Sequence, residues 1–109
     1  MKVAVAASAP ELDAPIDRRF GRCAWLVVVD TKTMQLEAIE NPGALAGTGA
    51  AIAAAQLVAD AGADAVVADG FGPNAIGALK AGGITIYRAG SGTVKDAVLA
   101  AAKGALTAL

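Results

Sequence analysis

The apolar and polar positions in the N-terminal part of the chain predict three β-strands. Val3–Ala7 is a short apolar run typical of a buried strand, and Trp25–Asp30 is a continuous, largely β-branched run typical of a central strand. Met34–Ala38 alternates between apolar and polar residues, as a half-buried strand does. The turn sequence DTKT joins the last two runs, so we expect them to pair as an antiparallel hairpin.

After Pro42 the pattern changes to helices that alternate with strands. We expect helices at Gly49–Ala61, from Pro73 to Gly82 or Gly83, and after Ser91 or Thr93, with strands at Asp64–Asp69 and Ile84–Tyr87. Thr48 is the expected N-cap of the first helix and Gly62 its C-terminal stop, while Thr93 and Asp96 have the spacing of a capping box. The order β-β-β-α-β-α-β-α predicts an α/β domain with one mixed five-stranded sheet covered by helices.

Composition and charge limit the kind of protein. Of the 109 residues 56% are hydrophobic and 17% charged, which indicates one folded domain over residues 1–109. The net charge of −1 argues against a general basic surface for nucleic acid. The uncharged run Asn41–Ala59 is too rich in alanine and polar residues for a bilayer span, and no signal peptide is visible, so we expect no membrane partner. The single cysteine excludes an internal disulfide, and the cytoplasm is the expected location.

The segment DRRFGRCAW, Asp17–Trp25, concentrates cations in an otherwise bland chain. Guanidinium groups bind multi-oxygen or multi-sulfur anions through a planar fork of donors. The candidate contact residues are Arg18, Arg19, Phe20, Gly21, Arg22 and Cys23. Neighbouring cations would lower the pKa of the Cys23 thiol and make it a candidate metal ligand, whereas a buried thiol would be inert. The alternative for the arginines is a solvated surface, or pairing with Asp13 and Asp17.

Glycine-bracketed turns recur between strands and helices. They are Gly47-Thr48-Gly49, Gly70-Phe71-Gly72 and Gly90-Ser91-Gly92. Such turns lie at the carboxyl ends of strands, where helix N-termini offer free N–H groups to an anion. Together with Pro73 and Asn74, these residues complete the predicted anion site; the alternative is that the glycines only permit tight turns.

Other functions receive less support from the sequence. Gly70–Ala75 fits the dinucleotide pattern G-x-G-x-x-A, but Arg88 stands where an acidic ribose-binding residue is expected, so a nucleotide-binding module is an alternative. No Walker-type phosphate loop is present. The chain has no histidine to act as a neutral-pH base, and we expect no enzyme. A two-metal nuclease would need a carboxylate cluster, for which Asp13, Asp17, Asp30 and Asp69 are candidates, but no basic track accompanies these acids.

Several segments are similar to the dinitrogenase iron–molybdenum cofactor biosynthesis (nitrogenase accessory) family, nearly from end to end. They are LDAPIDRRFGRC (12–23), IENP (39–42), GAAIAAAQLVADAGADAVV (49–67), GFGPNAIGAL (70–79) and GITIY (83–87). Arg18, Phe20, Gly21 and Arg22 match the first motif, and Gly70, Gly72, Pro73 and Asn74 match the fourth segment's motif.

The resemblance implies a ribonuclease H-like three-layer domain, with helices on both faces of the sheet and without the nuclease's catalytic apparatus. Members are small carriers or chaperones for metal–sulfur clusters, and single-domain relatives, the orange proteins, hold a molybdenum–copper sulfide cluster. Several members carry histidines in the loop after Asn-Pro, but Gly43–Gly49 has none. A conventional iron–sulfur cluster is coordinated by about four protein ligands, whereas this chain has one cysteine and no histidine. A preassembled thiomolybdate-type cluster, which brings its own sulfides, therefore fits better than an iron–sulfur cluster.

We therefore expect a monomeric carrier of a molybdenum–copper sulfide cluster, or of a related molybdenum or iron–sulfur cluster such as a nitrogenase cofactor precursor. Backbone N–H groups and arginines would hold it. Donor and acceptor proteins for the cluster would be transient partners. The alternatives are the nucleotide-binding module and an interaction domain in a metallocluster assembly complex.

Overall fold

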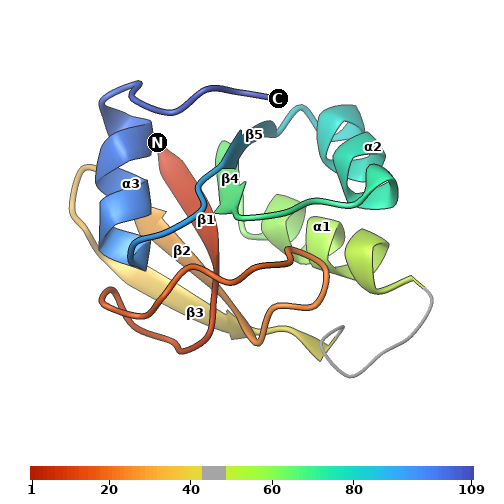
Figure 1. Ribbon diagram of the computed structural model, residues 1–109, viewed down its shortest axis with the longest axis horizontal. Coiled ribbons are helices and arrows are strands. Elements are labelled where there is room, and N and C mark those ends of the chain that lie inside the picture. Colours follow the sequence, from red (N-terminus) through yellow and green to blue (C-terminus); the bar gives the residue numbers. More distant parts are fainter. Residues whose placement is uncertain (43–48) are drawn as a thin grey trace.

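The computed structural model describes residues 1–42 and 49–109 (Figure 1). The elements follow the predicted order: β1 (Lys2–Ala7), β2 (Trp25–Asp30), β3 (Leu36–Glu40), α1 (Ala50–Asp60), β4 (Ala65–Ala68), α2 (Pro73–Ala81), β5 (Thr85–Arg88) and α3 (Val94–Ala102). The third strand begins two residues later than expected, at Leu36 rather than Met34. Met34 has φ of 60° and its N–H donates to the Asp30 carbonyl at 2.7 Å, so it belongs to the turn.

The strands form one five-stranded sheet in the order β3-β2-β1-β4-β5. β2 is antiparallel to both β1 and β3, which confirms the predicted hairpin, while β4 is parallel to both β1 and β5. It follows that β1, β3, β4 and β5 run in one direction. Their carboxyl ends therefore meet at the same edge of the sheet, which is where ligands bind in open α/β folds.

Helices cover both faces of the sheet, as predicted (Figure 1). Residues of β1 alternate between two apolar clusters: Ala4 and Ala6 pack with α1 and α2, whereas Val3 and Val5 pack with α3. The result is a three-layer arrangement with a core on each side of the sheet. None of the helices in the described part of the chain is long and apolar enough to cross a bilayer.

The helix ends agree with most of the sequence signals. Thr93 caps α3 in a full capping box: its side chain accepts from the Asp96 N–H at 3.2 Å, and the Asp96 carboxylate accepts from the Thr93 N–H at 3.0 Å. Ser91, the other candidate, is not the cap. The expected cap of the first helix was wrong, because Gly49 occupies the N-cap position of α1; Thr48 lies outside the described residues.

Candidate functional site

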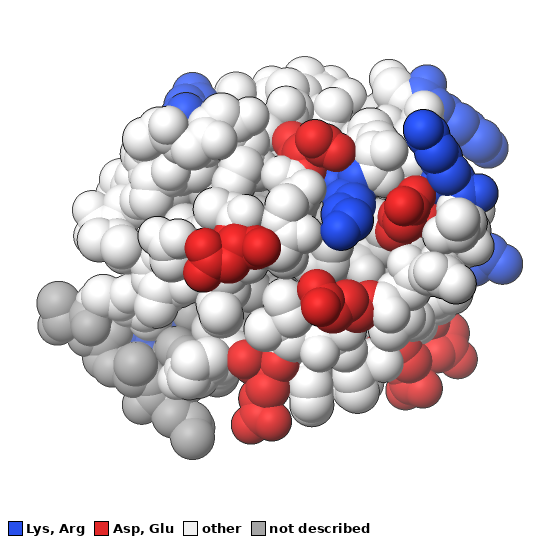
Figure 2. Space-filling view, turned by 180° about the vertical axis from the view of Figure 1, so that it is seen from behind, with Lys and Arg blue, Asp and Glu red and all other residues white. Residues whose placement is uncertain are grey.

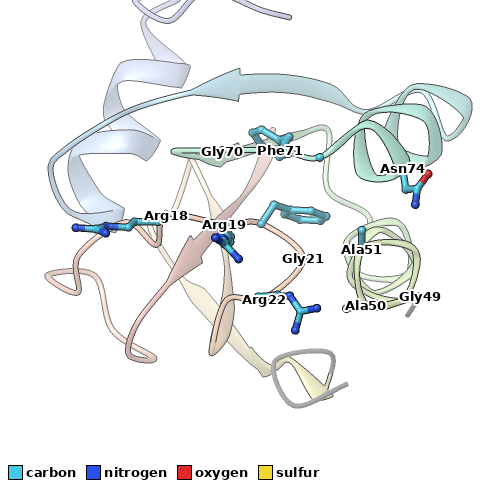
Figure 3. A pocket seen from close by; sticks show the side chains of 12 residues that line it. Arg18, Arg19, Gly21, Arg22, Gly49, Ala50, Ala51, Gly70, Phe71 and Asn74 are labelled. Atoms are coloured by element: carbon cyan, nitrogen blue, oxygen red, sulfur yellow. The ribbon is translucent and has the colours of Figure 1, made fainter. Parts of the chain in front are cut away.

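A cavity of about 610 Å³ lies at the carboxyl edge of the sheet (Figure 3). Three segments surround it: the loop Arg18–Cys23, here called the arginine loop, the start of α1, and the turn between β4 and α2. The lining residues are Arg18, Arg19, Phe20, Gly21, Arg22, Gly49, Ala50, Ala51, Gly70, Phe71, Gly72 and Asn74. The cavity thus gathers most of the described residues of the arginine loop and of the Gly70–Gly72 turn predicted from sequence.

Backbone hydrogen bonds attach the arginine loop to the end of β4. The Phe20 N–H donates to the Gly70 carbonyl at 3.0 Å, and the Asp69 N–H donates to the Asp17 carbonyl at 3.2 Å. The Asp17 N–H donates to the carbonyl of Ala6, near the end of β1, at 2.7 Å. The loop is therefore fixed against both parallel strands that end at the cavity, although it contains no regular secondary structure.

Two glycines allow the backbone segments to approach closely. A Cβ atom on Gly70 would lie 2.9 Å from the Arg18 carbonyl oxygen, and one on Gly21 would lie 3.0 Å from the Ala51 Cα. Both distances are shorter than an ordinary van der Waals contact. Glycine at these positions lets the arginine loop pack against the β4–α2 turn on one side and α1 on the other.

Aromatic side chains form an apolar wall in the cavity. Phe20 is fully buried and stacks on the half-buried Phe71, with ring centroids 5.3 Å apart and an interplanar angle of 29°. Ala50 and Ala51 add small apolar surface from the opposite side. The stack also connects the arginine loop to the β4–α2 turn, so the same contact shapes the wall and holds the loop.

The described charged residues that line the cavity all have one sign, although in Figure 3 the Arg18 side chain points away from the other labelled residues. Arg18, Arg19 and Arg22 are exposed, and no Asp or Glu is among the described lining residues. In Figure 3 the Arg22 side chain extends toward the start of α1. Figure 2 shows Asp and Glu side chains spread across the face opposite to the view of Figure 1, with Lys and Arg side chains gathered along one edge of that face. Three of the nine Lys and Arg residues of the chain line the cavity.

The N-termini of α1 and α2, which begin at the cavity, differ in their capping from the N-terminus of α3, which does not. α1 and α2 have glycines at their N-caps, no side-chain cap and no acidic residue in the first turn. Their first N–H donations within the helix come from Ala53 and Ile76, so the N–H groups before these have no intrahelical acceptor. α3, away from the cavity, has both the cap and the acid. Two helix N-termini with partial positive charge therefore open at the cavity.

Cys23 lies in the arginine loop but does not line the cavity. Its side chain is fully buried in the core cluster beneath α1 and α2. Burial, and after it the negative charge of Asp17, raises the pKa of the Cys23 thiol to about 12. The expected lowering of this pKa by the arginines is wrong, because the guanidinium groups face solvent while the thiol faces the core. Cys23 is a neutral thiol at pH 7, which is a poor metal ligand.

The third glycine turn is not part of the cavity. Gly90, Ser91 and Gly92 are absent from its lining and lead into α3, which packs on the other face of the sheet. The Gly92 carbonyl accepts from the Ile16 N–H at 3.1 Å, and Gly92 adopts φ of 108°, so this turn has a structural role. Pro73 occupies the first position of α2, next to the lining residues Gly72 and Asn74. Gly47 lies outside the described residues, as does Thr48.

Two of the four carboxylates considered for a nuclease accept hydrogen bonds from nearby backbone N–H groups. Asp17 accepts from the Arg18 N–H at 2.7 Å, and Asp30 accepts from the Lys32 N–H at 2.9 Å. Among the described residues, no group of three or more Asp, Glu, Cys or His is placed to hold a metal ion. Arg88, considered for nucleotide binding, donates through Nε to the Asp69 carbonyl at 3.1 Å. The described residues therefore contain no carboxylate cluster of the kind that a two-metal nuclease needs.

One buried polar residue near the cavity was missed by the sequence reasoning. Asn41 is 2% exposed, and its side-chain amide donates to the Cys23 carbonyl at 2.9 Å and to the Gly21 carbonyl at 3.3 Å. The available signal was a polar residue directly before Pro42, at the end of a strand. Ala50 and Ala51 were also missed, because alanine at the start of a helix carries no chemical signal of its own.

Comparison with known proteins decides the family. The sequence profile of the family described as "Dinitrogenase iron-molybdenum cofactor" matches residues 1–104. The chain belongs to this family. The apo form of the orange protein from Desulfovibrio gigas is 38% identical, with a TM-score of 0.94 over 99% of this chain and 92% of that one. A NifB-like protein from Thermotoga is 32% identical, with a TM-score of 0.85 over 99% and 92% of the chains.

A curated relative is also similar in sequence. An uncharacterized protein of Methanocaldococcus jannaschii is 28% identical over 92 residues, which cover 77% of this chain and 78% of that protein. These matches confirm the family resemblance seen in the motifs and the mixed five-stranded α/β fold.

Proposed function

We propose that this protein is a single-domain, monomeric carrier for a preassembled anionic metal–sulfur cluster, and not an enzyme. The cargo is a molybdenum–copper sulfide cluster or a related cluster, including a nitrogenase cofactor precursor. The observation that carries the proposal is the cavity, whose described lining has three arginines and no carboxylate. Family membership and the likeness to an orange protein support a role connected with such a cofactor. The carrier would work in the cytoplasm with transient donor and acceptor proteins.

The donors at the cavity suit the surface of a sulfide cluster. Terminal and bridging sulfides carry negative charge and accept hydrogen bonds from guanidinium and backbone N–H groups. Charge-assisted hydrogen bonds of this kind are stronger than neutral ones. The volume of about 610 Å³ falls within the usual range for a small-ligand site, which is roughly 300–1,000 Å³.

Coordinate bonds from side chains to the metals are less suited to holding the cargo in this chain than hydrogen bonds to its sulfides. The chain has no histidine and one cysteine, and the structure buries that cysteine away from the cavity. A cluster built on the protein needs about four ligands. The cargo would therefore arrive assembled, with its own sulfides completing the metal coordination. The wall of Phe20 and Phe71 would exclude water and strengthen the surrounding hydrogen bonds.

Reconstitution tests this proposal directly. The apo-protein is mixed with tetrathiomolybdate and Cu(I), desalted, and examined by visible absorption and metal analysis. We expect a coloured complex that survives desalting, and none when molybdate replaces tetrathiomolybdate. Failure of the native chain to retain molybdenum and copper would overturn the proposal.

A pair of charge-matched variants locates the binding site. Arg22→Ala removes a lining guanidinium, whereas Lys103→Ala removes one positive charge at the end of α3, on the other side of the sheet. A charge-assisted hydrogen bond is worth about 1.5–3 kcal/mol, so Arg22→Ala should weaken retention roughly 10- to 150-fold. Lys103→Ala should bind like the native chain. Equal losses in both variants would mean that net charge, and not the cavity, retains the cargo.

Nucleotide binding is a second candidate, favoured by the placement of Gly70, Gly72 and Asn74 in the cavity lining. Calorimetric titration with ATP and NADP distinguishes the two candidates. The carrier proposal predicts no saturable heat from either nucleotide. Tight binding of a nucleotide that blocks thiomolybdate uptake would favour the second candidate.

A further inference from the structure

Asn41 connects the end of β3 to the arginine loop through several hydrogen bonds. Its side-chain Nδ2 donates to the Cys23 carbonyl at 2.9 Å, to the Gly21 carbonyl at 3.3 Å and to the Cys23 Sγ at 3.6 Å. Its backbone N–H donates to the Ala24 carbonyl at 3.0 Å. Asn41, directly after β3, thus contacts three of the four residues Gly21–Ala24.

Arg22 lies in the chain between the two residues whose carbonyls accept from the Asn41 amide, Gly21 and Cys23. Gly21 is also packed against Ala51, where an added Cβ would lie 3.0 Å from the Ala51 Cα. The backbone on either side of Arg22 is therefore fixed, while the Arg22 side chain itself is exposed at the cavity.

The burial of Asn41 makes this connection specific. Asn41 is 2% exposed, and among the described residues it is the polar or charged residue that is buried. An apolar residue here would leave the Gly21 and Cys23 carbonyls without this donor, and a carboxylate would place negative charge against both. A side-chain amide provides donors for the two carbonyls in a single compact group.

We propose that Asn41 is a positioning residue that holds the arginine loop so that Arg22 faces the cargo in the cavity. This inference rests on the proposed carrier function for its effect on cargo, but its structural part can be tested without cargo. Asn41 does not touch the cargo. It acts through the backbone of Gly21 and Cys23, and its effect on retention depends on the Arg22 guanidinium.

Limited trypsin digestion tests the structural part on the apo-protein. Trypsin cleaves after Arg and Lys, so the rate of cleavage after Arg22 reports how well the loop is held. We expect Asn41→Ala to raise that rate roughly tenfold, as the loss of buried hydrogen bonds would allow. Cleavage after Lys80, at the end of α2, is the internal control and should not change. Equal acceleration at both positions would show general destabilisation and overturn the proposal.

Thiomolybdate–copper release then tests the coupling to Arg22. Asn41→Ala and Asn41→Asp should each release the cluster about tenfold faster than the native chain. In the Arg22→Ala background, the further effect of Asn41→Ala should be less than twofold, because both changes remove the same contact. Multiplicative effects in the double variant would refute a role through Arg22. If the native chain takes up no cluster, the carrier proposal fails while the digestion result still decides the structural role of Asn41.

Discussion

Replacing Gly70 by alanine should separate the arginine loop from the β4–α2 turn. The new Cβ would lie 2.9 Å from the Arg18 carbonyl oxygen, which is backbone and cannot move without shifting the loop. Gly70 also accepts the Phe20 N–H at 3.0 Å, so a shift weakens this hydrogen bond too. The φ angle of Gly70 is not in the left-handed region, and the cost is therefore steric.

The magnitude follows from these contacts. Overpacking costs about 1–3 kcal/mol, and a weakened hydrogen bond costs about 0.5–1.5 kcal/mol. We expect the free energy of unfolding to fall by about 2–3 kcal/mol, which corresponds to roughly 8–12 °C in melting temperature for a domain of this size. Urea unfolding followed by the fluorescence of the single tryptophan, Trp25 in β2, measures the change.

Gly77→Ala is the matched control. Gly77 lies within α2, and a Cβ there would meet no atom within 4 Å. Alanine is the better helix former, so this variant should be more stable by about 0.5–1 kcal/mol. The same substitution should thus have opposite signs at two positions seven residues apart. A Gly70→Ala protein with native stability would show that the loop does not depend on this close approach.

Two further predictions concern Cys23 and the α3 cap. Because burial raises the pKa of the Cys23 thiol from its usual 9.0 to about 12, the unfolded thiol ionises first and stability is lost from pH 9 upward. The loss is about 1.4 kcal/mol at pH 10, measured by urea unfolding, and a Cys23→Ala protein with the same pH dependence would contradict it. Thr93→Ala should lower the free energy of unfolding by about 1 kcal/mol through loss of the capping box. Thermal unfolding by circular dichroism checks this, and an equal effect of Ser91→Ala would argue against Thr93 as the cap.

The elements were predictable because their signals are local. The β-branched run Trp25–Asp30 and the alternation after it indicated two strands without any tertiary information, and the structure has both. The capping box of Thr93 and Asp96 needs only residues three apart. The parallel pairing of β4 with β5 followed from the helix between them.

The parts that failed depend on contacts between distant segments. Gly90–Gly92 has the same local sequence form as the Gly70 turn, but the two turns serve helices on opposite faces of the sheet. Proximity in sequence suggested that the arginines would act on Cys23, yet the chain turns the thiol inward and the guanidinium groups outward. Asn41 meets the arginine loop from 18 to 20 residues away, and no short motif reports such a contact.

The capping pattern connects the local sequence to the proposed role of the cavity. A side-chain N-cap stabilises a helix by about 1 kcal/mol relative to alanine, and a first-turn acid adds to this through the helix dipole. The chain uses both devices at α3, where the N-terminus meets only the protein's own backbone. It uses neither at α1 and α2, the two helices that begin at the arginine-lined cavity. A side-chain oxygen at either position would occupy the N–H groups and cancel part of the positive potential that the proposed anionic cargo would require. A residue that stabilises either helix start would therefore weaken the proposed binding.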